Sequence, residues 1–324
     1  MVALLTRLAP TVTVSEQFPA MGTLVGVTIV CARHQRIAAG EGIALVRARI
    51  ASFGVEAWAW GPGALACFNR ELAQGGPGII PPALRPLFER AWRLRQASGG
   101  LFEPRIAQLV RLWGFDDFVR LRAEPPPQQD IDLLLAALRC APAYDGGASY
   151  GPAPDTGWDL GAIAKGWIVD QCLDQLAAQG YANACIDAGG NLAVRGGKGR
   201  RAWRIGIRDP RADDPQQLLA SLEARDEAVI THGDDQRYFI HQGQRYAHVL
   251  DPVSGWPVRG LRALTVVHAD ATLADGGGAA LFAAGREGWR LLAERLGITQ
   301  VLAVNEDGSV DTTPELAARL NAWS

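Results

Sequence analysis

The sequence lacks an excess of charge of either sign. Lysine and arginine number 32 against 34 aspartate and glutamate residues, so the formal net charge is -2 and the pI is about 6.2. Proteins that bind nucleic acid or anionic lipid usually carry a basic field that neutralises phosphates. We therefore expect no nucleic acid among the partners of this protein.

Long hydrophobic runs are also missing. A helix that crosses a bilayer needs about 20 consecutive apolar residues, and the sequence contains no such run. The first residues, MVALLTRLAPTVTV, have a short apolar stretch without the small-residue cleavage pattern of a signal peptide. We expect no membrane span and a cytoplasmic protein, or a periplasmic protein if a leader has been removed.

Cysteine is present but lacks a pattern. None of the five cysteines forms the CxxC spacing of a zinc or redox site, and an odd number argues against a complete disulfide framework. The five positions are Cys31, Cys67, Cys140, Cys172 and Cys185. We expect them to be small buried hydrophobic side chains.

Strand and helix patterns are interspersed without a regular βαβ order. Apolar periodicity and turn residues predict helices over 35–53, 81–100 and 287–297 and a helical stretch near 270–284. Strands are predicted over 23–30, 182–188, 191–196, 202–209, 227–232, 236–241, 245–250 and 261–269. Proline and glycine predict loops over 124–130 and 141–157. The arrangement predicts an α+β fold with mixed sheets and packed helices.

The segment GWDLGAIAKGW (157–167) places Asp159 and Lys165 around the predicted start of a helix. Gly161 and Gly166 carry no side chain, so a ligand or another backbone can approach the first turn closely. The helix N-terminus together with Lys165 favours an anion. Asp159 can instead cap the first amides and leave Lys165 in solvent. The segment alone allows both interpretations.

Three later segments carry further candidate residues. The glycine pair of DAGGN (187–191) indicates a tight turn or a close approach of the backbone to a ligand. Residues 231–258 bring His232, His248 and other ionisable side chains into one hairpin-like region. Asp275 precedes three glycines, each of which costs about 1 kcal/mol in a helix relative to alanine. That run predicts a broken helix, or a loop whose carbonyls are free to bind a cation.

Eight short motifs follow one another along the chain from Met21 onward. They are MGT (21–23), SGGLFEP (98–104), WGF (113–115), DLGAIAKG (159–166), DAGGN (187–191), HGDDQRYF (232–239), AHVLDPVSGWP (247–257) and ADGGGAAL (274–281). In type and order they resemble the FAD:protein FMN transferase family, the ApbE-type flavin transferases formerly called thiamine biosynthesis lipoproteins. The resemblance implies one flavin transferase domain over residues 21–324, preceded by an N-terminal extension over residues 1–20.

The resemblance also implies an activity, which is transfer of FMN from FAD to a threonine of an acceptor flavoprotein, with magnesium and with release of AMP. It implies contacts to FAD from Met21, Leu101, Phe102, Glu103, Asp159, Lys165 and Val249. The implied magnesium ligands are Ala162, Asp275, Gly278 and position 279, which is Ala279 here. His248 matches a proposed base, since histidine suits proton transfer near neutral pH, and Asp275 is counted with it as catalytic. On general grounds His248 can also be a strand histidine that pairs with a neighbour.

The chain departs from the family pattern at several of these positions. Ala279 stands where the pattern has a ligand threonine, and FEPR (102–105) replaces an FDPT element. His232 and Asp235 replace a serine and a tyrosine. Trp58 or Trp60 can stack on a flavin or adenine ring or can belong to the core. These departures leave an alternative open, a FAD-binding module or a FAD pyrophosphatase of the same fold that has lost efficient transferase activity.

Overall fold

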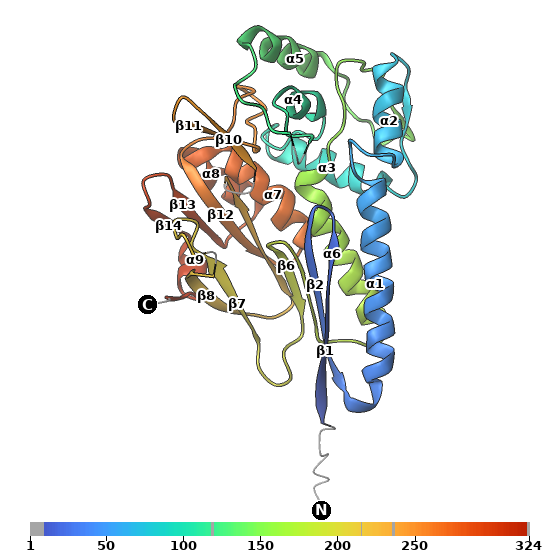
Figure 1. The fold of residues 1–324 in the computed structure, drawn as a ribbon, viewed down its shortest axis with the longest axis vertical. Coiled ribbons are helices and arrows are strands. Elements are labelled where there is room, and N and C mark those ends of the chain that lie inside the picture. Colours follow the sequence, from blue (N-terminus) through green and yellow to red (C-terminus); the bar gives the residue numbers. More distant parts are fainter. Residues whose placement is uncertain (1–9, 118–119, 215, 235–236, 323–324) are drawn as a thin grey trace, which may run out of the picture.

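The computed structural model describes residues 10–117, 120–214, 216–234 and 237–322, and an antiparallel sheet forms its centre (Figure 1). The order of its eight strands is β1-β2-β5-β6-β9-β12-β13-β14, and every neighbouring pair is antiparallel. Their bounds are β1 Thr11–Ala20, β2 Thr23–Ala32, β5 Ala184–Ala188, β6 Asn191–Arg195, β9 Glu227–Gly233, β12 Leu261–His268, β13 Val301–Asn305 and β14 Val310–Thr312. Strands and helices therefore combine as the predicted α+β fold.

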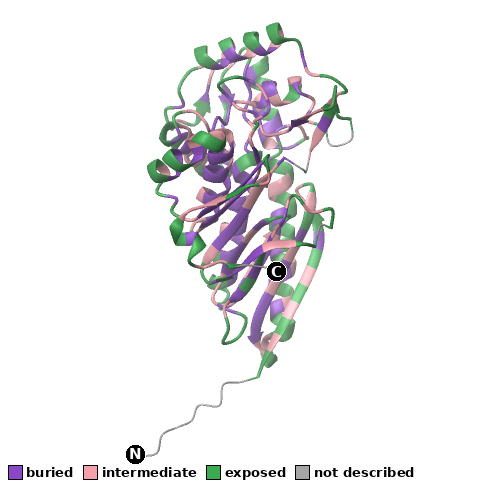
Figure 2. Ribbon diagram, turned by 90° about the vertical axis from the view of Figure 1, so that its left-hand side faces the viewer, coloured by how far each residue is buried: buried purple, intermediate pink, exposed green. Residues whose placement is uncertain are grey.

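Helices cover one face of this sheet. They are α1 (Arg36–Glu56), α6 (Gly161–Ala178) and α7 (Ala271–Ala283), with α8 (Gly285–Leu296) following α7. Alternate residues of β2, Val25, Val27 and Ile29, are fully buried and belong to the same hydrophobic cluster as the inner faces of α1 and α6. This alternation is the period-2 pattern expected of a strand with one face in the core. Figure 2 shows the buried residues gathered along the strands and the inner sides of the helices.

A second core lies on the other face of the sheet. It joins Val30, Val194 and Val229 of the main sheet to Trp203 and Leu222. The last two belong to a three-stranded sheet of order β15-β8-β7, with bounds β7 Trp203–Arg208, β8 Leu218–Ala224 and β15 Asn321–Ala322. The main sheet is thus covered on both sides, which explains why its strands are largely apolar.

A third group of elements packs at one end of the helices, at the top of Figure 1. It contains α2 (Ala64–Ala73), α3 (Arg85–Ala97), α4 (Ala107–Leu112), α5 (Gln128–Cys140), β3 (Gly78–Ile79), β4 (Ser149–Tyr150), β10 (Tyr238–His241) and β11 (Gln244–Ala247). Trp113 is fully buried here, stacks on Phe239 and Tyr246, and donates Nε1–H to the Gly255 carbonyl at 2.8 Å. The WGF motif therefore anchors the hairpin β10–β11. The short elements are η1 (Arg33–Gln35) and α9 (Pro314–Ala317).

Most predicted elements are confirmed to within a few residues, but the predicted loop over 141–157 contains the short strand β4, and two further expectations are wrong. The predicted loop over 124–130 ends early because α5 begins at Gln128. The glycines after Asp275 do not break the chain, since α7 runs without interruption from Ala271 to Ala283. The first residue of the predicted strand over 236–241 lies outside the described residues, and the rest includes β10.

The N-terminal strand, β1, belongs to the main sheet. The predicted domain boundary at residue 21 falls in the turn between β1 and β2, and Thr11–Ala20 pairs with β2 along its whole length. All five cysteines are free thiols; Cys31 and Cys172 are buried, whereas Cys67 and Cys140 are exposed, contrary to expectation. In the described part of the chain, no helix has the length and apolar character needed to cross a bilayer.

Candidate functional site

Helix α6 begins at the edge of the upper group of elements, and Asp159 precedes its first turn. The Asp159 carboxylate accepts a hydrogen bond from the Gly161 N–H at 2.8 Å, so it bonds the first amide of α6 from the position before the N-cap, Leu160. Its own N–H donates to the Pro104 carbonyl, which ties this segment to the FEPR loop. Burial raises the pKa of Asp159, although the Gly161 bond and the positive charges of Arg237 and Lys165 oppose the rise.

Gly166, one turn further along α6, is where α6 and α7 cross. A Cβ atom there would stand 2.2 Å from the Ala271 carbonyl oxygen and 2.7 Å from the Asp275 Cβ. Asp170 strengthens the crossing, since its carboxylate accepts hydrogen bonds from the Ala271 and Thr272 amides at the start of α7. The predicted close approach at Gly166 is thus a contact between two helix backbones.

Asp275 lies inside this crossing and is 1% exposed. Its Oδ2 accepts from the Gly166 N–H at 2.8 Å, and its Oδ1 accepts from Asn191 Nδ2 at 2.7 Å. In a regular helix the Gly166 N–H donates to the Ala162 carbonyl. Because this N–H donates to Asp275 here, the Ala162 carbonyl receives at most part of that hydrogen bond. Asn191 was missing from the predicted site, although it closes the DAGGN motif, whose glycines alone drew attention.

The three glycines after Asp275 are packing positions. A Cβ at Gly276 would stand 2.5 Å from Leu94 Cδ2, and one at Gly277 would stand 2.7 Å from Ile298 Cδ1. The missing side chains therefore let α7 sit close to its neighbours, and their cost in helix propensity is offset by this packing. Gly278 lies within α7, so its carbonyl belongs to the helical hydrogen-bond pattern. Ala279 is half-buried and brings only a methyl group.

His232, near the end of β9, faces α7 at the same place. A Cβ at Gly278 would stand 2.5 Å from the Nε2 atom of His232. That nitrogen is buried and has no hydrogen-bond partner within the part of the chain that the structure describes. Burial lowers the pKa of His232, and the carboxylate of Asp275 opposes this effect. The sequence showed His232 only as a departure from a motif, and its closeness to α7 could not be read from it.

His248 follows β11 and faces the same region from the hairpin. Its N–H donates to the Arg237 carbonyl at 3.0 Å, and its ring meets the edge of Phe115. The Arg237 guanidinium donates to the Phe115 carbonyl at 2.8 Å. Burial, aided by the positive charges of Arg237 and Lys165, lowers the pKa of His248 to about 4. The imidazole is therefore neutral at neutral pH, well clear of its ordinary titration range.

Lys165 is the positive charge common to these groups. Its charge acts on Asp159, His232 and His248, so these four side chains lie within electrostatic range of one another. They come from the segment before α6, from α6, from β9 and from the segment after β11. No hydrogen bond or ion pair of the Lys165 ammonium group joins it to another described residue. Fold topology thus gathers residues that are up to 89 positions apart in the sequence.

The two glycine-containing turns also meet. A Cβ at Gly189 would stand 2.0 Å from Thr23 Oγ1, so the DAGGN turn lies against the MGT turn. Met21 in that turn has a φ of 51°, and its side chain lies against α1 at Gly54. The positive φ places Met21 in a conformation that non-glycine residues seldom adopt.

Ion pairs between Glu103 and two arginines hold the FEPR loop (102–105) in place. The buried Glu103 carboxylate accepts from Arg95 Nε at 2.6 Å and from Arg105 Nε at 2.8 Å. Burial would raise the pKa of Glu103, but the hydrogen bonds and charges of Arg105 and Arg95 outweigh it and hold the pKa below its usual range. Phe102 is a buried core residue, while Leu101 is half-buried beside the core. Their predicted contacts with FAD stay predictions, as does that of Glu103, whose carboxylate is occupied by arginines.

The remaining predicted residues lie around this cluster. Val249, next to His248, packs against the main core and accepts a hydrogen bond from the Val258 N–H at 2.9 Å. Ala162 is exposed on the first turn of α6. Trp60 packs beside the core, whereas Trp58 is 41% exposed, so neither role proposed for the tryptophans is decided.

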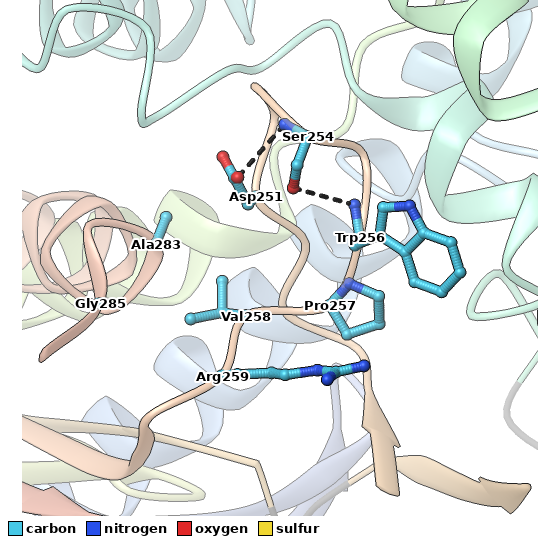
Figure 3. A pocket seen from close by; sticks show the side chains of 8 residues that line it. All are labelled: Asp251, Ser254, Trp256, Pro257, Val258, Arg259, Ala283 and Gly285. Atoms are coloured by element: carbon cyan, nitrogen blue, oxygen red, sulfur yellow. Dashed lines mark hydrogen bonds between the residues drawn. The ribbon is translucent and has the colours of Figure 1, made fainter. Parts of the chain in front are cut away.

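A pocket of about 350 Å³ lies elsewhere, between the loop after β11 and the end of α7 (Figure 3). Its lining residues are Asp251, Ser254, Trp256, Pro257, Val258, Arg259, Ala283 and Gly285. The Asp251 carboxylate accepts from the Val253 and Ser254 amides, which fixes the turn of this loop. None of the predicted site residues lines the pocket, so we place the candidate site at the Lys165 cluster on its chemistry.

Comparison with known proteins adds to this geometry. A family model described as the ApbE family matches residues 21–302. The FAD:protein FMN transferase of Rhodobacter capsulatus is 34% identical over an alignment 322 residues long, which covers 97% of this chain and 60% of that protein. The FAD:protein FMN transferase of Treponema pallidum is 37% identical over an alignment 217 residues long, which covers 60% of this chain and 57% of that protein. The chain thus spans about 60% of the length of these relatives.

A solved structure gives the same result for the fold. The crystal structure of the ApbE protein of Thermotoga maritima superposes with a TM-score of 0.84 at 26% identity, and the match covers 95% of this chain and 99% of that chain. The arrangement of helices and antiparallel sheets described above is therefore shared with a protein of known structure.

Proposed function

Because the chain belongs to the ApbE family, as the match over residues 21–302 shows, we propose that it transfers FMN from FAD to a threonine hydroxyl of an acceptor flavoprotein. In this reaction the hydroxyl oxygen forms a bond to the phosphorus of the FMN half. The pyrophosphate bond breaks, AMP leaves, and the hydroxyl proton passes to a base. The compartment stays the predicted one, cytoplasmic, or periplasmic if a leader precedes the chain.

The observation that carries the proposal is the convergence of Asp159, Lys165, His248 and Asp275 on one region from distant segments. The Lys165 ammonium stands in the first turns of α6, an 18-residue helix whose N-terminal amides favour an anion. A pyrophosphate placed there would meet both the helix terminus and a full positive charge. Arg237 adds a second cation next to Asp159.

The residues around Asp275 fit a divalent cation such as magnesium. Each carboxylate oxygen accepts one hydrogen bond, which leaves lone pairs on both for a cation. The carbonyl of Ala162, an exposed residue of the first turn of α6, can add a second hard oxygen, with phosphate oxygens and water completing the shell. When bound, the cation supplies positive charge that stabilises the oxygens of the reacting phosphates.

His248 is the residue of this cluster best suited to accept the hydroxyl proton. Its ring is neutral above about pH 4, so its proton-accepting form is present throughout the neutral range. Its Nδ1 atom is buried without a hydrogen-bond partner in the described structure. The backbone carbonyl of Arg237 accepts a hydrogen bond from the backbone N–H of His248, which positions the segment that carries the ring.

A second function, FAD hydrolysis, is favoured by one observation. Ala279 offers a methyl group on the face of α7 that carries Asp275, and the hydroxyl of Thr272 in the same helix donates to Asp170. Helix α7 therefore offers the site the Asp275 carboxylate and no free hydroxyl. In a more open site, water could replace the acceptor hydroxyl and yield free FMN and AMP.

One experiment separates these functions. The protein is incubated with FAD, magnesium and an acceptor domain that contains a target threonine, and the acceptor is weighed by intact mass spectrometry. Transfer predicts an acceptor heavier by FMN less water, and the matched threonine-to-alanine acceptor should stay unmodified. Free FMN and AMP without a modified acceptor would support hydrolysis, and FAD recovered intact would contradict both reactions.

A further inference from the structure

His232 presents a buried nitrogen to the same part of α7 that carries Asp275. Its Nε2 atom has no accessible surface and no hydrogen-bond partner within the described residues. The carbonyls of Ala274 and Asp275 lie near the ring, but neither reaches hydrogen-bonding geometry with Nε2. A buried polar atom in this situation calls for an explanation, because nearly all such atoms are paired.

The backbone of α7 is shaped around this ring. A Cβ at Gly278 would stand 2.5 Å from Nε2 and 2.6 Å from Cδ2, distances that real side chains do not tolerate. Residue 278 lies three positions after Asp275 on the helix, so both occupy the same face. The glycine therefore lets the imidazole edge reach the helix surface beside the carboxylate.

The partners of the carboxylate leave it free to act together with this nitrogen. Gly166 and Asn191 each donate one hydrogen bond to Asp275 and hold its orientation from α6 and β6. Neither donor comes from His232. A neutral imidazole nitrogen and an oriented carboxylate on adjoining elements are a common pair of ligands for a divalent metal ion.

We infer that Nε2 of His232 is a ligand of the divalent cation held by Asp275, and that this site prefers a cation that accepts nitrogen, such as Mn²⁺, to Mg²⁺. The inference rests on the proposed function only in placing the cation at Asp275. Magnesium demands oxygen ligands in near-ideal octahedral geometry. Mn²⁺ also suits oxygen ligands, but as a first-row transition metal ion it accepts an imidazole nitrogen more readily than Mg²⁺ does. Replacing an oxygen ligand by nitrogen should thus shift the preference of the site.

The direct test uses Mn²⁺ alone and needs no substitution. Mn²⁺ is added to the whole protein, and electron spin echo envelope modulation is recorded for protein with natural-abundance histidine and with ¹⁵N-labelled histidine. We expect modulation from one directly bound imidazole nitrogen, which changes with the isotope. Bound Mn²⁺ without nitrogen modulation would overturn the inference, as would failure of Mn²⁺ to bind.

Variants assign the nitrogen. His232→Ser should abolish the modulation and weaken Mn²⁺ binding by at least about 10–100-fold, the loss seen even for indirect partners of a metal. His34→Ser is the matched control, because His34 is exposed in η1. Modulation that survives in His232→Ser and disappears in His248→Ala would assign the ligand to His248 and reject His232.

A double variant tests the preference itself. His232→Ser with Ala279→Thr exchanges the nitrogen for hydroxyl oxygens on the same face, and calorimetry should then show Mg²⁺ affinity equal to or above that of the parent while Mn²⁺ affinity falls. Unchanged affinity for both ions would contradict the proposed ligand. Failure of flavin transfer with nitrogen modulation intact would reject the transferase function and leave this metal site standing.

Discussion

At the scale of single residues, the surroundings of Lys165 favour one of the two interpretations that the sequence left open. The sequence left it as either a solvated lysine or an anion ligand. The structure places it in electrostatic range of Asp159, His232 and His248, without an ion pair of its own among the described residues. A cation next to a helix N-terminus and without a carboxylate partner is suited to an anionic ligand.

Lys165→Ala should therefore weaken FAD binding. A charge-assisted contact to phosphate contributes about 1.5–3 kcal/mol, so the dissociation constant should rise by about 10–150-fold in a flavin fluorescence titration. Lys198, the other lysine of the sequence, is exposed in the loop after β6 and provides the control Lys198→Ala. Equal affinities for both variants and the parent would return Lys165 to the solvated interpretation.

His248→Gln should slow transfer by about 10²–10⁴-fold and change FAD affinity little, because a base acts mainly in the transition state. Burial and the charges of Arg237 and Lys165 lower the pKa of His248 to about 4, so protonation removes the base only near that pH. The acid limb of kcat/KM should lie near pH 4 in the parent and be absent from the residual rate of the variant. A limb near pH 6.5 in both proteins would assign the limb to another group.

The sequence indicated which residues belong to the candidate site better than it indicated how they are held and charged. The motif pattern selected Asp159, Lys165, His248 and Asp275, which the structure does bring into one region. It gave no sign that Asn191 orients Asp275, because a hydrogen bond across 84 positions depends on the pairing of strands with helices. The depressed pKa of His248 likewise arises from burial, which a linear sequence does not contain.

At the scale of elements, the crossing of α6 and α7 fixes the geometry of the site. Helix α7 is attached to α6 by the Gly166 bond to Asp275 and by Asp170, whose carboxylate holds the Ala271 and Thr272 amides. Burial raises the pKa of Asp170 in this position. Any change in the spacing of these helices should therefore move the Asp275 carboxylate.

Gly166→Ala tests this dependence. The added Cβ would stand 2.2 Å from a backbone carbonyl, which cannot rotate away, so the helices must separate. We expect a loss of about 1–3 kcal/mol of unfolding free energy, measured by urea denaturation, with a weaker cation dependence of FAD binding. Gly40→Ala in α1 is the control, since nothing lies within 4 Å of its Cβ, and it should be neutral or stabilising by up to about 1 kcal/mol. Equal stability of the two variants would contradict close packing at the crossing.

Helix and strand periodicity predicted the elements well, and it failed where packing overrides propensity. The three glycines after Asp275 carry a cost that argued for a broken helix, yet α7 is continuous because Leu94, Ile298 and His232 fill the space of the missing side chains. The prolines before Gln128 also led to the prediction of a loop over 124–130, whereas α5 begins at Gln128 directly after this proline-rich segment. Proline is tolerated there because the first amides of a helix have no intrahelical partner.

At the scale of the whole molecule, the site lies where the separate parts of the fold meet. The main sheet supplies His232 and Asn191, the helical layer supplies Lys165 and Asp275, and the segment after β11 supplies His248. The composition and periodicity of the sequence predicted the α+β class, and its motifs pointed to the residues of the candidate site. It could not predict that β6, α6 and α7 meet at Asp275, because antiparallel pairing in a sheet of this strand order is set by tertiary packing.

A ligand bound at such a junction should stabilise the entire fold, and Asp275 should couple FAD to the cation. FAD at about 100 times its dissociation constant should add about 2.7 kcal/mol of stability, seen as a rise in Tm. In the parent, saturating magnesium should raise this FAD-dependent shift further, and by reciprocal linkage FAD should tighten magnesium binding.

Asp275→Asn should remove the magnesium-dependent part of the shift. The amide that replaces the carboxylate carries one oxygen and one NH₂ group, and both Gly166 and Asn191 are donors aimed at this position. The oxygen of the new amide can keep the Gly166 bond, but its NH₂ group then faces the Asn191 amide, which must turn over to accept from it. The melting temperature of the variant can therefore differ from that of the parent, and the quantity to compare is the shift caused by magnesium in the presence of FAD. Asp174→Asn is the control, because that side chain is 68% exposed on α6 and its removal should leave the shift at the parent value. If Asp275→Asn shows the same magnesium-dependent shift as the parent, the cation binds elsewhere, and Asp275 serves only to hold α7 against α6.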